Sequence, residues 1–288
     1  MTLRLLYEAA KKRLEAAGIV EAALDARLLL EYACRVGHHD LLAHGEREVA
    51  ENEAASLMRF IERRATHVPL QYLTGICEFM GLEFLVDERV LIPRQDTEIL
   101  VEEVLRSLHD GFRILDMCTG SGCILLSLLH YSNGCMGVGA DLSMEALAVA
   151  RENARRFLEE NVTFISGDLF ENITGQFEII VSNPPYIRAT LIDELMEEVR
   201  CHEPHSALDG GEDGLDFYRK IVPQSRRYLC GGGQLFVEIG YDQREAVERL
   251  FEQAGYRQIT TVQDFSGHDR VVYATLPSGW SADEPMRE

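Results

Sequence analysis

The sequence predicts an α/β protein: a small helical domain followed by a parallel sheet wrapped by helices. Two observations carry this prediction. Residues 1–72 show only helical spacing of apolar side chains, whereas strands and helices alternate strictly after Asp110-Gly111. With 288 residues and a hydrophobic fraction of 46%, the chain is long enough to bury two cores.

The first 72 residues predict a helical domain that recognises or positions a partner. Thr2 is the expected cap of a helix that ends before Gly18, and Pro69 ends the last long helix. The further helices are expected over residues 21–35, 40–43 and 49–65. No tight cluster of catalytic residue types occurs here, and the alternative is a domain that serves only for packing.

Residues 73–95 predict a β-hairpin linker between two domains. The run from Phe79 to Val86 is typical of a hairpin, and the run Val90–Arg94 is expected to close it. A helix is then expected over residues 95–108, with acidic side chains in the first turn, where the helix dipole favours them.

Residues 96–277 predict the sheet domain. The expected strands cover residues 113–117, 136–140, 162–166, 178–182 and 234–239, with a final pair over 256–263 and 270–276. The expected helices cover residues 122–131, 143–159, 191–200, 215–229 and 244–254. Gly231-Gly232-Gly233 is interpreted as the stop of the fourth of these helices, and residues 278–288 are expected to be disordered.

Composition narrows the function classes. A net charge of −20 disfavours nucleic acid as a direct partner and favours a protein or a small molecule. The seven cysteines are scattered and never spaced as CxxC, which predicts a reducing cytoplasm without disulfides or a zinc site. The nine histidines form no ligand pattern, so no metal is expected. Neither a membrane-spanning segment nor a signal peptide is expected.

Four successive predicted strands each end in a polar side chain: Asp116, Asp141, Asp168 and Asn183. Ligands bind outside the carboxyl ends of parallel strands. Each residue alone is better explained as a strand-end cap, but the set favours a ligand site.

The turn after Asp116 continues Met-Cys-Thr-Gly-Ser-Gly and lacks the third glycine of a dinucleotide fingerprint. A carboxylate at Asp116 would repel a pyrophosphate but suits a cationic amino group. Asp141 suits ribose hydroxyls, and Asp168 suits an adenine amino group, with Leu169 beside it. Amino acid, ribose, adenine and a positive sulfonium together indicate S-adenosyl-L-methionine.

The stretch Asn183-Pro184-Pro185-Tyr186 follows an apolar strand. Proline restricts the residue before it to extended backbone, so the Asn183 amide and the Pro184 carbonyl are expected to be held rigidly at the strand end. With the ring of Tyr186, they would form a cradle for a planar NH₂ group. A strand-terminating turn with a capping asparagine is the alternative for this motif alone.

These motifs together resemble the release factor glutamine methyltransferases, the PrmC/HemK family. Further stretches of the resemblance are residues 68–75, 90–98 and 203–211, and it extends to about residue 276. The family usually has glycine where this chain has Cys118 and proline where it has Gln95. The resemblance implies a seven-stranded Rossmann-like methyltransferase domain dependent on S-adenosylmethionine.

The resemblance also implies methylation of the glutamine side-chain nitrogen in the Gly-Gly-Gln motif of class 1 release factors, by an enzyme expected to be a monomer. Its expected catalytic residues are Asn183, Pro184, Pro185 and Tyr186. The expected cofactor-binding residues are Asp116, Cys118, Thr119, Gly120, Ser121, Gly122, Asp141, Leu142, Asp168, Leu169 and Asn183. Methylation of a ribosomal-protein glutamine, adenine-N6 methylation of nucleic acid and a catalytically silent cofactor-binding protein are the alternatives.

Overall fold

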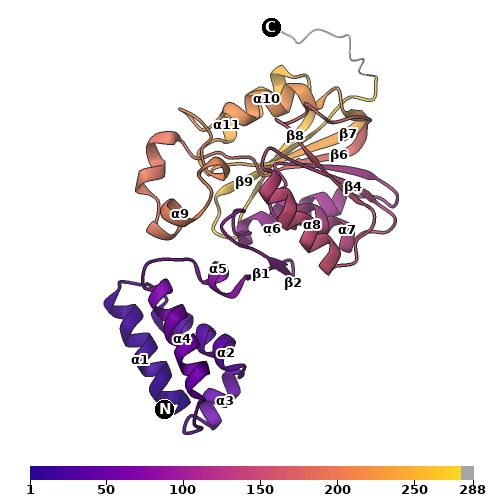
Figure 1. Ribbon diagram of the computed structural model, residues 1–288. Coiled ribbons are helices and arrows are strands. Elements are labelled where there is room, and N and C mark those ends of the chain that lie inside the picture. Colours follow the sequence, from indigo (N-terminus) through magenta and orange to yellow (C-terminus); the bar gives the residue numbers. More distant parts are fainter. Residues whose placement is uncertain (280–288) are drawn as a thin grey trace. The chain divides into compact units, whose positions relative to one another are not determined.

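The computed structural model describes residues 1–279 and divides them into two compact units (Figure 1). The first unit comprises Met1–Ile76 together with Met196–His202. The second comprises Cys77–Leu195 and the chain from Glu203 onward. Within residues 1–279, no helix is both long and apolar enough to cross a membrane.

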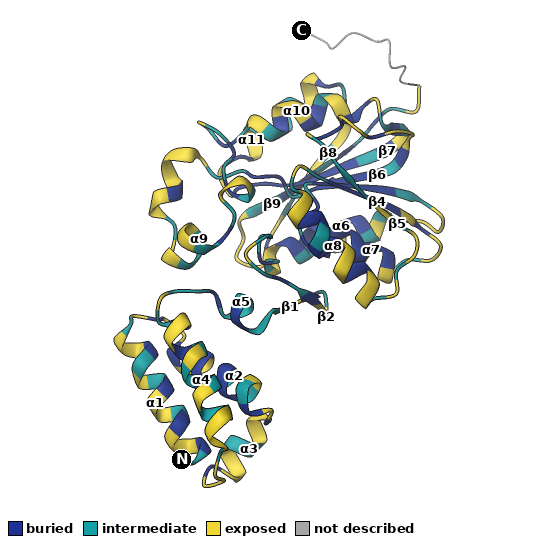
Figure 2. Ribbon diagram, viewed as in Figure 1, coloured by how far each residue is buried: buried dark blue, intermediate teal, exposed yellow. Residues whose placement is uncertain are grey.

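The first unit is helical. Its elements are α1 (Leu3–Ala16), α2 (Ala22–Cys34), α3 (His38–Ala43), α4 (Glu51–Arg64), α5 (Leu70–Thr74) and, from the second segment, α9 (Glu197–His202). The Thr2 side chain caps α1 by accepting from the backbone N–H of Leu5. The apolar faces of α1, α2 and α4 form a common core, and their other faces are exposed (Figure 2).

A buried ion pair joins two of these helices. Arg64 Nε of α4 donates to Asp25 Oδ2 of α2 at 2.7 Å, and both side chains are nearly fully buried. Burial raises the pKa of Asp25, while the bond to Arg64 opposes that rise. Arg64 also pairs with Glu198, which ties the segment Met196–His202 to α4.

The second unit contains a seven-stranded sheet in the order β5-β4-β3-β6-β7-β9-β8 (Figure 1). The strands are β3 (Arg113–Met117), β4 (Met136–Asp141), β5 (Val162–Ser166), β6 (Phe177–Ser182), β7 (Leu229–Glu238), β8 (Arg257–Gln263) and β9 (Asp269–Thr275). The first five pair in parallel, and β9 runs antiparallel to both β7 and β8. The predicted α/β fold with a seven-stranded Rossmann-like sheet is confirmed.

Helices cover both faces of this sheet. One face packs against α10 (Asp216–Ser225) and α11 (Arg244–Gln253), around a core that includes Leu115 and Met117. The other packs against α6 (Gln95–Ser107) and α7 (Cys123–His130), with α8 (Met144–Arg156) next to α7, around a core that includes Ile114. Neighbouring residues of β3 thus enter different cores, as the two-residue period of a strand requires.

Four expectations about elements were wrong. The hairpin consists of β1 (Ile76–Phe79) and β2 (Leu82–Leu85), so it starts earlier, and residues 90–94 form no strand. Its turn is Met80-Gly81, both with positive φ, as two-residue hairpins prefer. A short helix, α5, follows Pro69, where none was expected.

The other two concern residues 191–200 and 229–233. A single helix was expected over residues 191–200, but the chain forms a 3₁₀ helix, Ala189–Glu194, and then α9. Gly231-Gly232-Gly233 belongs to β7 and does not end a helix. Of the residues 278–288 that were expected to be disordered, 278 and 279 form a turn, and the rest lie outside the described residues.

Candidate functional site

The carboxyl ends of β5, β4, β3 and β6 lie side by side at one edge of the sheet. The chain proceeds from β3 to β4 and β5 in one direction, then crosses to β6 and β7 on the other side of β3. The crevice of such a sheet lies where the order reverses, next to β3 and β6. The structure therefore brings Asp116, Asp141 and Asn183 to neighbouring strand ends.

The turn after β3 has an unusual backbone. Cys118, Gly120 and Gly122 all have positive φ, at 62°, 54° and 79°. Gly122 is the N-cap of α7, and a Cβ added there would lie 3.2 Å from the Leu126 side chain of that helix. At Gly120, by contrast, an added Cβ would have no neighbour within 4 Å among the described residues. The chain thus leaves open space where a ligand can approach its backbone.

Asp116 is fully buried beneath this turn. Its Oδ2 accepts from Thr119 Oγ1 at 2.6 Å, whereas its Oδ1 has no hydrogen-bond partner within residues 1–279. Burial raises the pKa of Asp116 to about 7, and the bond from Thr119 opposes that rise. A cationic donor at Oδ1 would offset the cost of burying this carboxylate.

Asp141 connects the turns after β3 and β4. Its Oδ2 accepts from the backbone N–H of Gly120, and its Oδ1 accepts from that of Ser143, both at 2.9 Å. Burial raises its pKa, and these backbone bonds oppose the rise. Each oxygen keeps a lone pair for a further donor such as a hydroxyl.

The remaining predicted cofactor residues differ in exposure. Leu142 is 70% exposed, Asp168 is exposed, and Leu169 and Ser121 are buried. Asp168 and Leu169 also line a hollow of about 530 Å³ with Phe170, Glu171, Lys220, Gln224 and Tyr228.

Asn183-Pro184-Pro185-Tyr186 begins directly after β6. Ser182 Oγ donates to the Met117 carbonyl at 2.7 Å, which binds the end of β6 to the end of β3. Asn183 Nδ2 donates to Thr97 Oγ1 of α6 at 3.2 Å. Tyr186 Oη donates to Glu238 Oε1 of β7 at 3.2 Å. Of the four predicted catalytic residues, Asn183 and Tyr186 thus have side chains held by residues from other elements.

The segment around Gly210 and Gly214 supports the backbone of Tyr186. Gly210 N–H donates to the Ile187 carbonyl, and Ile187 N–H donates to Leu208. Gln243 Nε2 donates to the carbonyls of both Tyr186 and Gly214. An added Cβ on Gly214 would lie 2.4 Å from the Tyr186 carbonyl oxygen. Only glycine fits at this approach.

Gly214→Ala is expected to displace Tyr186 and reduce activity strongly. Gly255→Ala is the matched control, because Gly255 has nearly the same positive φ and no neighbour within 4 Å among the described residues. The control should lose about 1–2 kcal/mol of stability from backbone strain alone and keep its activity. Thermal melting and turnover, measured side by side, check this. Equal turnover in the two variants would contradict the role assigned to the contact.

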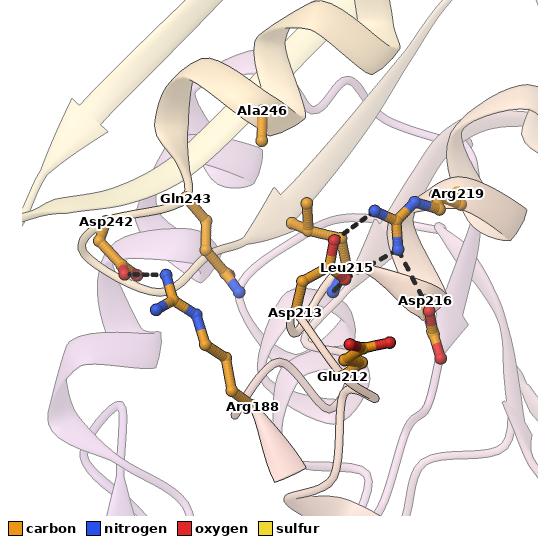
Figure 3. Close-up of a pocket in the computed structure, with 9 residues that line it drawn as sticks. All are labelled: Arg188, Glu212, Asp213, Leu215, Asp216, Arg219, Asp242, Gln243 and Ala246. Carbon is orange, nitrogen blue, oxygen red and sulfur yellow. Dashed lines mark hydrogen bonds and ion pairs between the residues drawn. The ribbon is translucent and has the colours of Figure 1, made fainter. Parts of the chain in front are cut away.

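A second hollow, of about 690 Å³, lies beside this segment (Figure 3). In it Arg188 reaches Asp242, and Arg219 reaches Asp213 and Asp216. None of the predicted site residues lines this hollow.

The two departures from the family pattern have structural explanations. Cys118 has a φ of 62°, a conformation that glycine adopts without strain. Its side chain packs against the core between the sheet and helices α10 and α11. Gln95 is the first residue of α6, a position that proline suits because its fixed φ matches the helix and its N–H is not needed there.

Cys118→Gly is therefore expected to stabilise the fold by about 1–2 kcal/mol because it removes backbone strain. The lost packing of the thiol and the greater flexibility of the unfolded chain should reduce this gain by a smaller amount. Equilibrium denaturation should show stability equal to or above that of the parent. A loss of several kcal/mol would mean that the Cys118 side chain matters more than its strain.

Thr97, Glu238 and Gln243 were not predicted as site residues. Glu238 lies at the carboxyl end of β7 and repeats the pattern of a polar residue at a strand end, so extending that rule by one strand would have found it. Thr97 and Gln243 carry no such signal.

Comparison with protein families gives two matches. Residues 6–75 match the family described as PrmC N-terminal domain, and residues 94–200 match the family described as Methyltransferase small domain.

Two named relatives match nearly the full chain. A protein of Caulobacter vibrioides named "Release factor glutamine methyltransferase" is 45% identical over 278 residues, 94% of this chain and 96% of the relative. One of the same name from Moorella thermoacetica is 44% identical, over 95% of this chain and 98% of the relative.

Among solved structures, a methyltransferase from Pyrococcus furiosus matches with a TM-score of 0.53 at 18% identity, covering 69% of this chain and 91% of that chain. A likeness at this identity supports the fold alone.

Proposed function

Because the chain belongs to the release factor glutamine methyltransferase family, as relatives 45% and 44% identical over almost its full length show, we propose that it methylates a release factor. The methyl group of S-adenosylmethionine goes to the side-chain amide nitrogen of the glutamine in a Gly-Gly-Gln motif. The observation that carries this proposal is the placement of Asn183-Pro184-Pro185-Tyr186 beside the turn after β3, at one sheet edge.

The residues at this edge fit S-adenosylmethionine. Asp116 Oδ1, which has no partner in the described part of the chain, suits the amino group of the methionine moiety. The open space at Gly120 allows close approach to the backbone, and the carboxylate of Asp141 suits the ribose hydroxyls. The exposed Leu142 and Asp168 are available to the adenine. When bound, this cofactor supplies an activated methyl group on a sulfonium that leaves as a neutral thioether.

The protein's task is then to present a poor nucleophile. An amide nitrogen has its lone pair delocalised into the carbonyl. Asn183 Nδ2 is engaged by Thr97, which leaves Asn183 Oδ1 to accept one N–H of the substrate glutamine, while the Pro184 carbonyl accepts the other. These bonds favour a pyramidal nitrogen in line with the methyl group, and Tyr186 packs against the amide plane. The nitrogen loses one proton, which goes to water after the transfer. Such positioning contributes up to about 7–11 kcal/mol.

The helical residues 1–72 are proposed to bind the release factor away from its Gly-Gly-Gln loop, with residues 73–95 as a linker and 96–277 as the methyltransferase domain. The match of residues 6–75 to a family-specific N-terminal domain supports this. The net charge of −20 supports a protein substrate without direct nucleic-acid contact, and the seven free cysteines support a cytoplasmic location. We also propose that the enzyme acts as a monomer.

The test is a transfer assay with labelled S-adenosylmethionine and purified class 1 release factors, native and with the Gly-Gly-Gln glutamine changed to alanine. Label should enter the native factor only. Label in both factors, or label only in a ribosomal protein or DNA offered in parallel, would refute the proposed substrate.

A further inference from the structure

Glu238 is a buried carboxyl group with an unused oxygen. It lies at the end of β7, next to β6, and is 1% exposed. Its Oε1 accepts from Tyr186 Oη at 3.2 Å, whereas its Oε2 has no hydrogen-bond partner in the part of the chain that the structure describes. A buried acid that is only partly bonded is costly to stability, so its presence requires a reason.

Thr97 lies between Glu238 and Asn183. It is 2% exposed, and its Oγ1 accepts from Asn183 Nδ2 at 3.2 Å. A threonine hydroxyl has a single hydrogen to donate. Thr97 also lies near the Glu238 carboxyl group and lowers its pKa, as a nearby hydroxyl donor does. Because Thr97 Oγ1 accepts from Asn183 Nδ2, the hydroxyl hydrogen of Thr97 is left to turn toward Glu238, whose Oε2 has no partner among the described residues.

We propose that Glu238 is a positioning residue that orients both Asn183 and Tyr186 for methyl transfer. Ionised Glu238 can only accept, so Thr97 donates to it and in turn can only accept from Asn183. Asn183 must then direct its Nδ2 inward and its Oδ1 toward the substrate. The same carboxylate holds the hydroxyl of Tyr186. This inference rests on the methyl transfer proposed above.

The relay depends on the protonation state of Glu238. Burial raises the pKa of Glu238 to about 7, and the nearby Asp96 adds to that rise. Thr97, Arg270 and the hydrogen bond from Tyr186 oppose it. From α10, Tyr218 donates to the backbone carbonyl of Glu238 and not to its carboxylate.

When Glu238 is protonated, it can donate to Thr97 Oγ1. Thr97 can then donate to Asn183, which favours the flipped amide, with Asn183 Oδ1 turned toward Thr97 and away from the substrate. Turnover should therefore fall as the pH falls through about 7.

Glu238→Gln and Thr97→Val test the relay with little change in shape. Each should lower kcat about 100-fold, as for a misplaced catalytic group, and leave the Kd for S-adenosylmethionine unchanged. Thr97→Ser keeps the hydroxyl and should retain activity. Tyr256→Phe is the control, because it removes a buried hydroxyl bonded to Ser225 and not to this relay. The decline in kcat below about pH 7 should be absent in Glu238→Gln.

The melting temperature of Glu238→Gln distinguishes a positioning role of Glu238 from a purely structural one. The folded-state pKa of Glu238 is raised above its ordinary value, so ionisation of Glu238 costs stability as the pH rises from about 4.5 toward 7. Glu238→Gln avoids that cost, so at pH 8 it should melt no lower than the parent. Loss of kcat together with a much lower melting temperature would overturn the assignment, as would parental kcat in Glu238→Gln.

A measurement independent of activity completes the test. The side-chain amide resonance of Asn183, identified by its loss in Asn183→Ala, should shift with a midpoint near pH 7 in the parent and not in Glu238→Gln. An Asn183 amide that does not titrate overturns the relay even if the enzyme is active. Failure of the parent to methylate release factors while the amide still titrates would instead refute the proposed function.

Discussion

Asn183→Ala is expected to lower kcat about 10²–10³-fold, which is the usual loss when an enzyme loses one side chain that hydrogen-bonds the transition state. The variant loses the acceptor Oδ1 for the substrate N–H, while the backbone carbonyl of Pro184 remains. Because the turn after β3 and Asp141 are untouched, the Kd for S-adenosylmethionine should stay close to that of the parent. Calorimetry and single-turnover methyl transfer measure the two quantities separately.

Asn133→Ala is the matched control for this variant. Asn133 is an exposed asparagine whose Nδ2 bonds to Asp110, outside the site. Its removal should leave kcat unchanged. Parental turnover in Asn183→Ala would contradict the proposed cradle, and an equally large loss in Asn133→Ala would show that the assay reports general damage.

Asp141→Ala is expected to weaken S-adenosylmethionine binding by at least about 10-fold, since hydrogen bonds to a charged group are worth about 1.5–3 kcal/mol each. The variant also frees the backbone N–H groups of Gly120 and Ser143, so the turn after β3 loses one of its links to the end of β4. Calorimetric titration with the cofactor checks the prediction.

Glu145→Ala controls for the loss of one negative charge in the same neighbourhood. Glu145 is an exposed residue in the first turn of α8. Its removal should leave cofactor affinity unchanged. If both variants bind equally well, Asp141 is no part of the cofactor site.

The strands that carry the site were predictable because each is a short apolar run that ends in a polar residue. The end of β3 at Met117 and both ends of β5 agree with the sequence prediction. The triple glycine was misread because glycine is a common helix stop, yet here it marks close contact between backbones. A Cβ on Gly231 would lie 2.8 Å from the Ser278 carbonyl, and one on Gly233 would lie 2.9 Å from that of Glu178.

The positions of Asn183 and Tyr186 at a strand end could be predicted, but what holds their side chains could not. The partner of Asn183, Thr97, is 86 residues away in the sequence, and the partner of Tyr186, Glu238, is 52 residues away. Such pairs arise from the crossover connections of the sheet and leave no local pattern. The roles of the site residues and the domain boundaries stay predictions.

The most direct test of the proposed activity is fragmentation mass spectrometry of a class 1 release factor after reaction with this enzyme and S-adenosylmethionine. The proposal predicts one added methyl group, on the side-chain nitrogen of the glutamine in the Gly-Gly-Gln motif. A methyl group on any other atom of the factor, or none while another substrate is methylated, would contradict it.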